Sequence, residues 1–260
     1  MNIFLLTDLE GIPGVDDISQ MDRTGEGYQI ARKMLCESIN IAVEACFQNG
    51  ASVVYYLDGH GGGGNVIEEF IDSRAVKCSI QEWQQLLKAG KIDYQIELGS
   101  HARAGTIGGF LDHTLSSKAY FYIKHNGVEM SELSLHAVLC AKNHVPIIAT
   151  MGDEAACRQA KEYIPDIYTG AVKVSHGRNK ATTYDNYRDI ITDTITRALK
   201  APENVSYIHY GEPLAVEQAY YRTDMCEAAL EAHQANAIRL DARTLIKTVQ
   251  SIDCYADLKF

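Results

Sequence analysis

The amino-acid sequence predicts an α/β fold, with a mostly parallel central sheet flanked by helices and a smaller α+β unit at the C-terminal end. Two observations support this class. Short apolar segments alternate along most of the chain with longer segments of helical periodicity, the order that parallel strands connected by helices require. The first two predicted strands are separated by a loop, a helix and a tight turn at Gly50, which is the order of a right-handed parallel unit.

The first strand is expected within Asn2–Ile12, where the apolar run Ile3–Leu6 is followed by Asp8 and Glu10. Side chains two residues apart on a strand point to the same face, so the two carboxylates project together. They lie at the carboxyl end of the strand, where open α/β sheets place their sites. Because burial of an unpaired carboxylate is costly, such groups are paired, protonated or bound to a metal. We therefore interpret Asp8 and Glu10 as half of a metal site.

The remaining elements of the larger unit follow the same alternation. Strands are indicated by β-branched and aromatic residues, and helices by apolar residues that recur every three to four positions. An Asn-Gly pair at 126–127 indicates a hairpin turn. The expected helices are Tyr28–Asn49, Val66–Phe70, Glu82–Ala89, Ser131–Asn143, Ala155–Tyr163 and Tyr184–Lys200. The expected strands are Ala51–Leu57, Asp93–Leu98, Ala119–Ile123, Val145–Met151 and Ile167–Val174.

A linker-like segment, Ala201–Asn204, divides the chain into a domain of residues 1–200, which carries the candidate site, and a small C-terminal unit of residues 201–260. Strand-like and helix-like segments alternate in the small unit, so we expect it to be α+β. The expected strands are Ser206–Tyr210, Leu214–Tyr221 and Ala237–Asp241, and the expected helices are Asp224–His233 and Ala242–Asp253.

Charge and cysteine content exclude several classes of partner and location. The chain has 260 residues and a formal net charge of −10, so nucleic acid and anionic membrane, which need a basic face, are not expected partners. Seven cysteines without a Cys-x-x-Cys pair indicate a reducing compartment rather than a disulfide framework. With no basic leader and no apolar stretch near the ~18–20 residues of a membrane span, we expect a cytoplasmic protein.

Ionisable side chains follow the other predicted strands as well, and the carboxyl ends of parallel strands share one edge of a sheet. Mixed carboxylate and imidazole ligands suit zinc. A pair of such ions, typically ~3.5–4 Å apart, acidifies water and polarises a carbonyl, which favours hydrolysis of an amide or ester. The candidates at strand ends are Asp8, Glu10, Asp58, His60, His101 and Asp153, and His113 and Glu132 follow in the next stretch of chain.

Each candidate alone also has a structural explanation. His60 among glycines can cap a helix, His101 can lie in a polar turn, and Glu132 at a helix start is favoured by the helix dipole without a metal. We expect Asp58 and Asp153 to order loops rather than to bind metal. The His-Gly-Gly-Gly run that starts at His60 imitates the oxyanion loop of esterases, but no Gly-x-Ser-x-Gly nucleophile accompanies it.

Several segments together resemble the D-aminopeptidase family typified by DppA, a protein of the dipeptide-transport operon. The order and spacing of these segments agree over roughly residues 1–180. They are Thr7–Ile12, Asp58–Asn65, Gly99–Thr106, Asp112–Thr114, Gly127–Ala137, Ala149–Ala156 and Gly170–Arg178. The resemblance implies a self-compartmentalising peptidase with two zinc ions per subunit, assembled as a homodecamer.

The resemblance also implies which residues hold the two ions. Asp8 would bridge both of them. Glu10 and His101 would complete one site, and His60 and Glu132 would complete the other. These roles come from the matching segments, and the residue pattern alone leaves them open.

His113 would occupy the position of the family's catalytic histidine. We assign it an acid–base or oxyanion-stabilising role, because water is the more natural nucleophile at a metal centre. The expected protein is a zinc-dependent aminopeptidase that cleaves short peptides or amino-acid amides with a free N-terminus, with the choice between D and L configuration open. Two alternatives stay open: a non-catalytic metal- or ligand-binding protein, and a phosphorylase-like α/β enzyme whose Gly61–Gly64 loop cradles phosphate.

Overall fold

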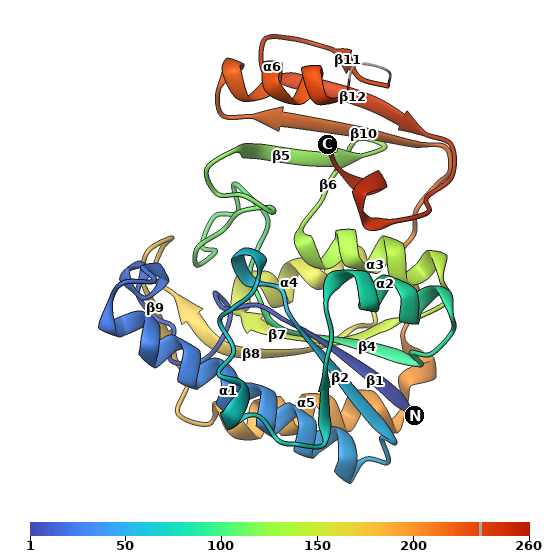
Figure 1. Ribbon diagram of the computed structural model, residues 1–260. Coiled ribbons are helices and arrows are strands. Elements are labelled where there is room, and N and C mark those ends of the chain that lie inside the picture. Colours follow the sequence, from blue (N-terminus) through green and yellow to red (C-terminus); the bar gives the residue numbers. More distant parts are fainter. Residues whose placement is uncertain (234–235) are drawn as a thin grey trace.

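The computed structural model describes residues 1–233 and 236–260 and arranges them in layers (Figure 1). A seven-stranded sheet lies between two layers of helices, and a five-stranded sheet lies beyond one of these layers. The expected fold class, a mostly parallel sheet flanked by helices, is confirmed. Within the described ranges, no helix has the length and apolar character that a bilayer crossing requires.

The large sheet has the strand order β3-β2-β1-β4-β7-β8-β9, and its neighbouring strands are parallel except β8 and β9. Its central strands are apolar because helices cover both faces, and every residue of β7 is buried. The strands are β1 (Asn2–Thr7), β2 (Val53–Asp58), β3 (Ala75–Lys77), β4 (Tyr94–Ser100), β7 (Ile147–Asp153), β8 (Tyr168–Ser175) and β9 (Ala181–Thr183).

Helices α1 and α5 cover one face of this sheet, and α2, α3 and α4 cover the other (Figure 1). Nearly all of α3 is buried, since it lies between the two sheets, and its apolar residues accordingly surround the whole helix. The helices are α1 (Glu26–Gln48), α2 (Ile80–Lys88), α3 (Glu132–Lys142), α4 (Glu154–Tyr163), α5 (Tyr187–Lys200) and α6 (Thr223–Ala232). The 3₁₀ segments are η1 (Ile18–Met21), η2 (His60–Gly62), η3 (Glu68–Phe70), η4 (Pro202–Asn204) and η5 (Tyr255–Leu258).

The second sheet is antiparallel, with the order β11-β12-β10-β5-β6, and α6 covers its outer face (Figure 1). The β5–β6 hairpin turns at Asn126 and Gly127, both with positive φ, as the Asn-Gly pair predicted. Strand β10 pairs with β5, so this sheet takes strands from both sides of residue 200; the division into residues 1–200 and 201–260 stays a prediction. The strands are β5 (Tyr120–His125), β6 (Val128–Glu129), β10 (Leu214–Tyr220), β11 (Ile238–Arg239) and β12 (Thr244–Val249).

Two predictions in the C-terminal part were wrong. The helix expected over Ala242–Asp253 is strand β12, because Thr244–Val249 pairs along its length with β10 and tertiary pairing overrides the local pattern. The strand expected at Ser206–Tyr210 belongs to neither sheet. In the larger unit, the helix expected over Val66–Phe70 is only the short 3₁₀ segment η3, and the three-residue strands β3 and β9 are too short for a periodic signal.

The backbone after β1 lies directly against the end of β4. The amide of Asp8 donates to Leu98 O at 2.8 Å, and the amide of Gly11 donates to Gly99 O at 2.8 Å. Gly99 has φ +87°, and a Cβ built there would lie 2.1 Å from Asp8 O. Only glycine permits this approach, which brings the two acids after β1 beside the segment that continues from β4 to His101.

We expect Gly99→Ala to destabilise the fold by about 3 kcal/mol or more, because the new Cβ overlaps the Asp8 carbonyl and forces the two strand ends apart. Gly105→Ala is the matched control: its φ is +80°, but no heavy atom lies within 4 Å of the built Cβ. Gly105→Ala should lower the free energy of unfolding by only about 1–2 kcal/mol, the cost of placing a side chain on a left-handed backbone. Urea unfolding of both variants measures the difference, and equal losses would show that the close approach is unimportant.

Candidate metal centre

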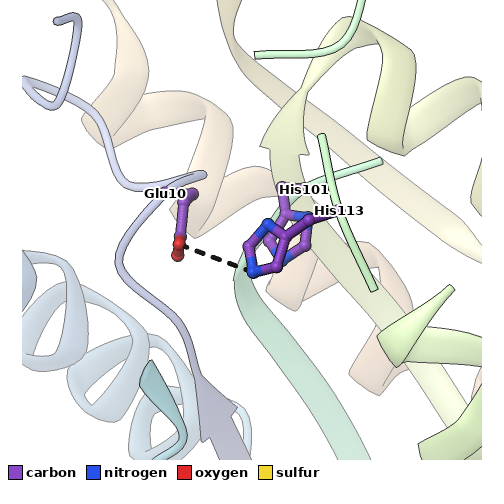
Figure 2. A group of neighbouring side chains, drawn as sticks. All are labelled: Glu10, His101 and His113. Carbon is purple, nitrogen blue, oxygen red and sulfur yellow. Dashed lines mark ion pairs between the residues drawn. The ribbon is translucent and has the colours of Figure 1, made fainter. Parts of the chain in front are cut away.

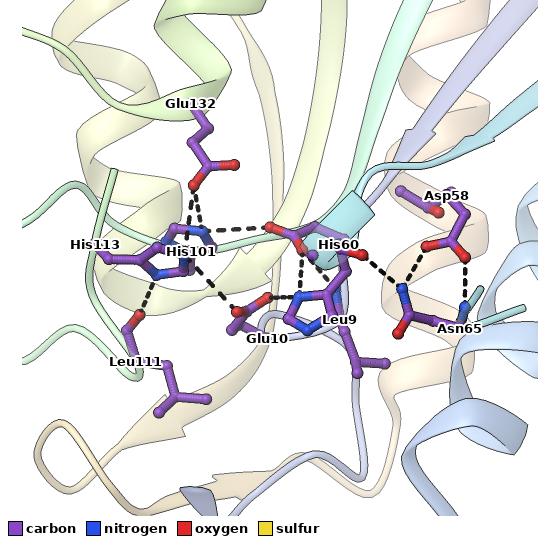
Figure 3. A network of polar contacts seen from close by, with 12 residues as sticks. Leu9, Glu10, Asp58, His60, Asn65, His101, Leu111, His113 and Glu132 are labelled. Carbon is purple, nitrogen blue, oxygen red and sulfur yellow. Dashed lines mark hydrogen bonds and ion pairs between the residues drawn. The ribbon is translucent and has the colours of Figure 1, made fainter. Parts of the chain in front are cut away.

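The six predicted site residues gather at the carboxyl edge of the large sheet (Figure 3). Asp8 and Glu10 follow β1, His60 follows β2, and His101 follows β4. His113 lies in the loop before β5, and Glu132 lies in the first turn of α3. The structure forms overlapping groups in which the candidate ligand atoms all lie within 4.8 Å of one another. These groups are Asp8, Glu10 and His60; Asp8, His101 and Glu132; and Glu10, His101 and His113.

His101 defines the first half of the centre. Its Nδ1 donates to Ala102 O at 3.0 Å, which leaves Nε2 facing Asp8 Oδ2 at 3.3 Å and Glu132 Oε1 at 3.2 Å. Nε2 is buried and has no hydrogen-bond partner. A ring nitrogen that faces two carboxylate oxygens needs a proton or a metal ion between them, so this atom fits a metal ligand.

His60 defines the second half. Its Nδ1 lies 2.8 Å from Glu10 Oε2 and 3.2 Å from Asp8 Oδ1. Asp8 therefore presents one carboxylate oxygen to each imidazole, the arrangement that a bridging ligand requires. In these contacts Glu10 faces His60 and Glu132 faces His101, and Glu10 also lies in one group with His101 and His113. The pairing that the resemblance implies, Glu10 with His101 and His60 with Glu132, stays a prediction.

The electrostatics of the cluster favour positive charge between the carboxylates. Burial opposes charge on His60, but Glu10 and Asp8 outweigh it and raise its pKa to about 11. Burial likewise opposes charge on His101, yet Glu132 and Asp8 raise its pKa well above the usual value. For Asp8, burial acts to raise the pKa, but the imidazoles of His101 and His60, which face its two oxygens, hold it well below normal. Glu132, despite burial, has its pKa lowered to about 2, chiefly by His101.

His113 lies beside this centre with one nitrogen already engaged. Its Nδ1 donates to Leu111 O at 2.8 Å, and its ring stacks on His101 with centroids 4.0 Å apart and planes 5° apart. Its Nε2 lies 3.9 Å from Glu10 Oε1 (Figure 2) and 3.6 Å from Glu132 Oε1 (Figure 3). Because a carbonyl only accepts, Nδ1 carries a proton, and Nε2 is the atom that can exchange a proton with a neighbouring group.

Two acids order the surrounding loops, as expected from the sequence. Asp58 Oδ2 accepts from the amides of Asn65 at 2.7 Å and Val66 at 3.1 Å. Asn65 Nδ2 in turn donates to His60 O at 2.7 Å, so Asp58 fixes the glycine-rich loop that presents the imidazole (Figure 3). Asp153 accepts from the amide of Ala156 at 2.6 Å and so caps α4, while its other oxygen anchors the amide of residue 110 at 2.7 Å.

Sequence reasoning missed Lys173, which lies fully buried behind the centre on β8. Its Nζ donates to Glu10 O at 2.8 Å and to Val15 O at 2.5 Å, so it ties down the segment that carries Glu10. Burial lowers the pKa of Lys173 to about 7, against the opposing pull of Asp16, Asp153 and Glu10. A lysine in the middle of an otherwise apolar strand was the signal in the sequence.

A cavity of about 690 Å³ opens beside the centre and gives a small molecule access to it. Asp8, His101 and Glu132 line one end, and the cavity continues along α3 to His136 and Tyr255. Buried carboxylates and imidazoles that converge at the carboxyl edge of a parallel sheet, beside such a cavity, define a candidate metal-dependent hydrolase on an α/β scaffold.

The chain belongs to the D-aminopeptidase family, whose sequence profile matches residues 1–257. A curated D-aminopeptidase of Bacillus subtilis (strain 168) is 29% identical over 182 residues, which span 69% of this chain and 66% of that relative. The solved structure of the Zn-dependent D-aminopeptidase DppA from Bacillus subtilis, a self-compartmentalizing protease, superposes with a TM-score of 0.90 at 22% identity, covering 99% of this chain and 95% of that one. The family expected from the sequence is confirmed, and with it the assignment to the peptidases.

We expect Asp8→Asn to abolish tight binding of both divalent ions, because Asp8 faces both halves of the cluster, whereas His60→Gln and Glu132→Gln should each lose one ion. Native mass spectrometry of the folded protein titrated with Zn²⁺ counts the ions. His176→Gln, which changes an exposed histidine, is the matched control. Full metal content in Asp8→Asn would contradict the bridging arrangement.

Proposed function

We propose that this chain is a metal-dependent aminopeptidase that hydrolyses short peptides or amino-acid amides with a free N-terminus. The ligands of two zinc ions per subunit are Asp8, Glu10, His60, His101 and Glu132. One observation carries the proposal: a single, partly buried carboxylate, Asp8, faces an imidazole on each side, and each imidazole faces a second carboxylate. This donor set suits zinc, and a solved structure of the same fold is described as Zn-dependent.

Zinc at such a centre supplies Lewis acidity, which polarises a carbonyl and acidifies water. The chain's own residues orient the reaction. Glu10 and Glu132 line the approach to His113, whose Nε2 takes a proton from the attacking water and delivers it to the departing amine. The bond from His113 Nδ1 to Leu111 O fixes the ring so that Nε2 stays directed at the centre.

The positive φ of Leu111, at +50°, indicates that this loop is held in a demanding conformation. The amide of Leu111 donates to Arg178 O at 2.9 Å, which anchors the loop to the turn between β8 and β9. The loop that carries His113 is therefore positioned by several contacts rather than left free, as a residue in a proton-transfer role requires.

We further propose D-configured substrates, a closed homo-oligomer and a cytoplasmic location. The family description and the self-compartmentalizing relative support the first two. Exposed apolar side chains support an interface between copies: Phe121 and Tyr221 lie edge to face on the second sheet at 5.8 Å, and Ile107 is 97% exposed. A decamer is the form that the family resemblance implies.

The phosphorylase-like alternative loses support in the glycine-rich loop. A phosphate cradle needs several free backbone amides. The amide of Gly63 already donates to His60 O at 2.9 Å, and that of Asn65 to Asp58 Oδ2 at 2.7 Å. Arg23 donates to the carbonyls of Gly61 and Gly63, at 3.2 and 3.3 Å, and so holds the loop closed.

We expect the protein to hydrolyse D-alaninamide or D-alanyl-D-alanine, to lose this activity on chelation and to regain it with zinc. His113→Gln should lower kcat by about 10²–10⁴, the range for loss of a proton-transfer group, with its metal content retained. Steady-state kinetics alongside metal analysis test both points, with His176→Gln as the control. Undiminished turnover after chelation, or turnover that needs phosphate but no metal, would refute the proposed function.

A further inference from the structure

A further imidazole, that of His136, lies at the cavity beside the candidate metal centre. His136 follows Glu132 by one turn of α3, so the two side chains project from the same side of this helix, and both line the cavity. None of the groups of candidate ligand atoms among the described residues includes His136. Its placement at the cavity therefore needs an explanation other than metal binding.

The ring of His136 is held in one orientation by two aromatic rings. It stacks on the ring of Tyr255, with centroids 5.4 Å apart and planes 29° apart. It also meets the indole of Trp83 at a centroid distance of 5.7 Å and an angle of 85°. An imidazole packed in this way keeps its two nitrogens in fixed directions, so the partner of each nitrogen can be assigned.

A chain of hydrogen bonds decides which nitrogen of His136 carries a proton. The indole nitrogen of Trp83 only donates, and it donates to Gln95 Oε1 at 2.8 Å. Gln95 therefore directs its Nε2 at Glu97 Oε1, at 2.7 Å. The carboxylate of Glu97 also faces His136 Nδ1 at 3.3 Å. Because a carboxylate accepts, Nδ1 carries a proton.

The other ring nitrogen of His136, Nε2, is left for a ligand. No group of the described residues forms a hydrogen bond with it, yet it is not one of the unpaired polar atoms that are shut off from solvent, in contrast to Nε2 of His101. Because His136 lines the cavity, the open side of Nε2 is the cavity. The buried network behind His136 thus directs one imidazole nitrogen at the space beside the metal centre.

The charge of the Glu97–His136 pair favours a cationic donor. With a neutral imidazole, the pair carries the single negative charge of Glu97. Burial acts to lower the pKa of His136, but Glu97 outweighs it and raises the pKa, so Nε2 is a stronger base than an isolated imidazole. An amino group that meets Nε2 shares one proton with it, and Glu97 balances the resulting positive charge wherever the proton lies.

We propose that His136 binds the free α-amino group of the substrate through Nε2, and that Glu97 positions the imidazole for this contact. The inference rests on the proposed function and assigns residues to its requirement for a free N-terminus. Glu132 and His136 are neighbours on α3, so a substrate whose scissile carbonyl lies at the metal centre has its adjacent amino group within reach of His136. A substrate without this amino group leaves Nε2 without a partner.

The test compares two ligands that share a metal-binding group and differ in the amino group. D-alanine hydroxamic acid carries the α-amino group, and propionohydroxamic acid lacks it. Zinc-loaded wild-type protein should bind the amino compound about 10–100-fold more tightly, the range for a hydrogen bond that involves a charged group. Isothermal titration calorimetry measures both dissociation constants.

Two variants locate the source of this preference. His136→Phe keeps the aromatic packing and removes Nε2, so it should abolish the preference and leave the affinity for propionohydroxamic acid unchanged. In Glu97→Gln, the new amide donates to Nδ1, so Nε2 carries the proton and no longer accepts, and the preference should fall by a similar factor. The double variant should lose no more than either single variant, because the two residues act as a unit.

His125→Phe is the matched control, because it removes a buried histidine that binds Leu258 O and does not line the cavity, and it should keep the preference. Equal binding of the two hydroxamates by the wild type, or a preference that survives in His136→Phe or Glu97→Gln, would overturn the subsite. An equal loss of affinity for both compounds would also reject it, because His136 would then support the metal centre alone.

Glu97→Gln decides the question if His136→Phe does not fold, because the replacement has almost the same shape and buries no charge. Failure of the zinc-loaded wild type to bind either hydroxamate would refute the metal centre of the proposed function, and the amino-group subsite would fall with it. Binding of both compounds without a preference leaves the metal centre intact and rejects only the role of His136.

Discussion

The structure depends on one electrostatic constraint: three carboxylates and two imidazoles meet in a largely buried space around Asp8. Positive charge between the carboxylates must offset their repulsion. Asp8 Oδ1 and Oδ2 each face a different histidine, at 3.2 and 3.3 Å. Burial of so many acids without compensation would cost far more than a domain's net stability of about 5–15 kcal/mol. The proposed metal ions would supply this compensation.

The fold supplies this convergence through its parallel strands. β1, β2 and β4 end at the same edge, so residues more than 90 positions apart, such as Asp8 and His101, meet without any local sequence link. Backbone contact at Gly99 removes the space that a side chain would occupy, and Lys173 fixes the segment after β1 from behind. The same edge opens into the cavity, which places the reactive groups beside a space of substrate size.

The convergence of the site residues could largely be predicted from the sequence. Acids two residues apart at a strand end share one face, and histidines that follow parallel strands share one edge of the sheet. The grouping of Glu10 with His60 could not, since it depends on the conformation of a glycine-rich loop that no periodicity describes. Tyr255 carries no spacing signal and reaches the cavity only because η5, which follows the second sheet in the chain, packs on α3. The strand β12 was missed for the same reason, because its partner β10 lies elsewhere in the chain.

Anomalous diffraction from crystals of the zinc-loaded protein tests the central claim most directly. The account predicts two peaks about 3.5–4 Å apart on either side of Asp8, one between His60 and Glu10 and the other between His101 and Glu132. Peaks elsewhere in the molecule, or none within reach of Asp8, would contradict it.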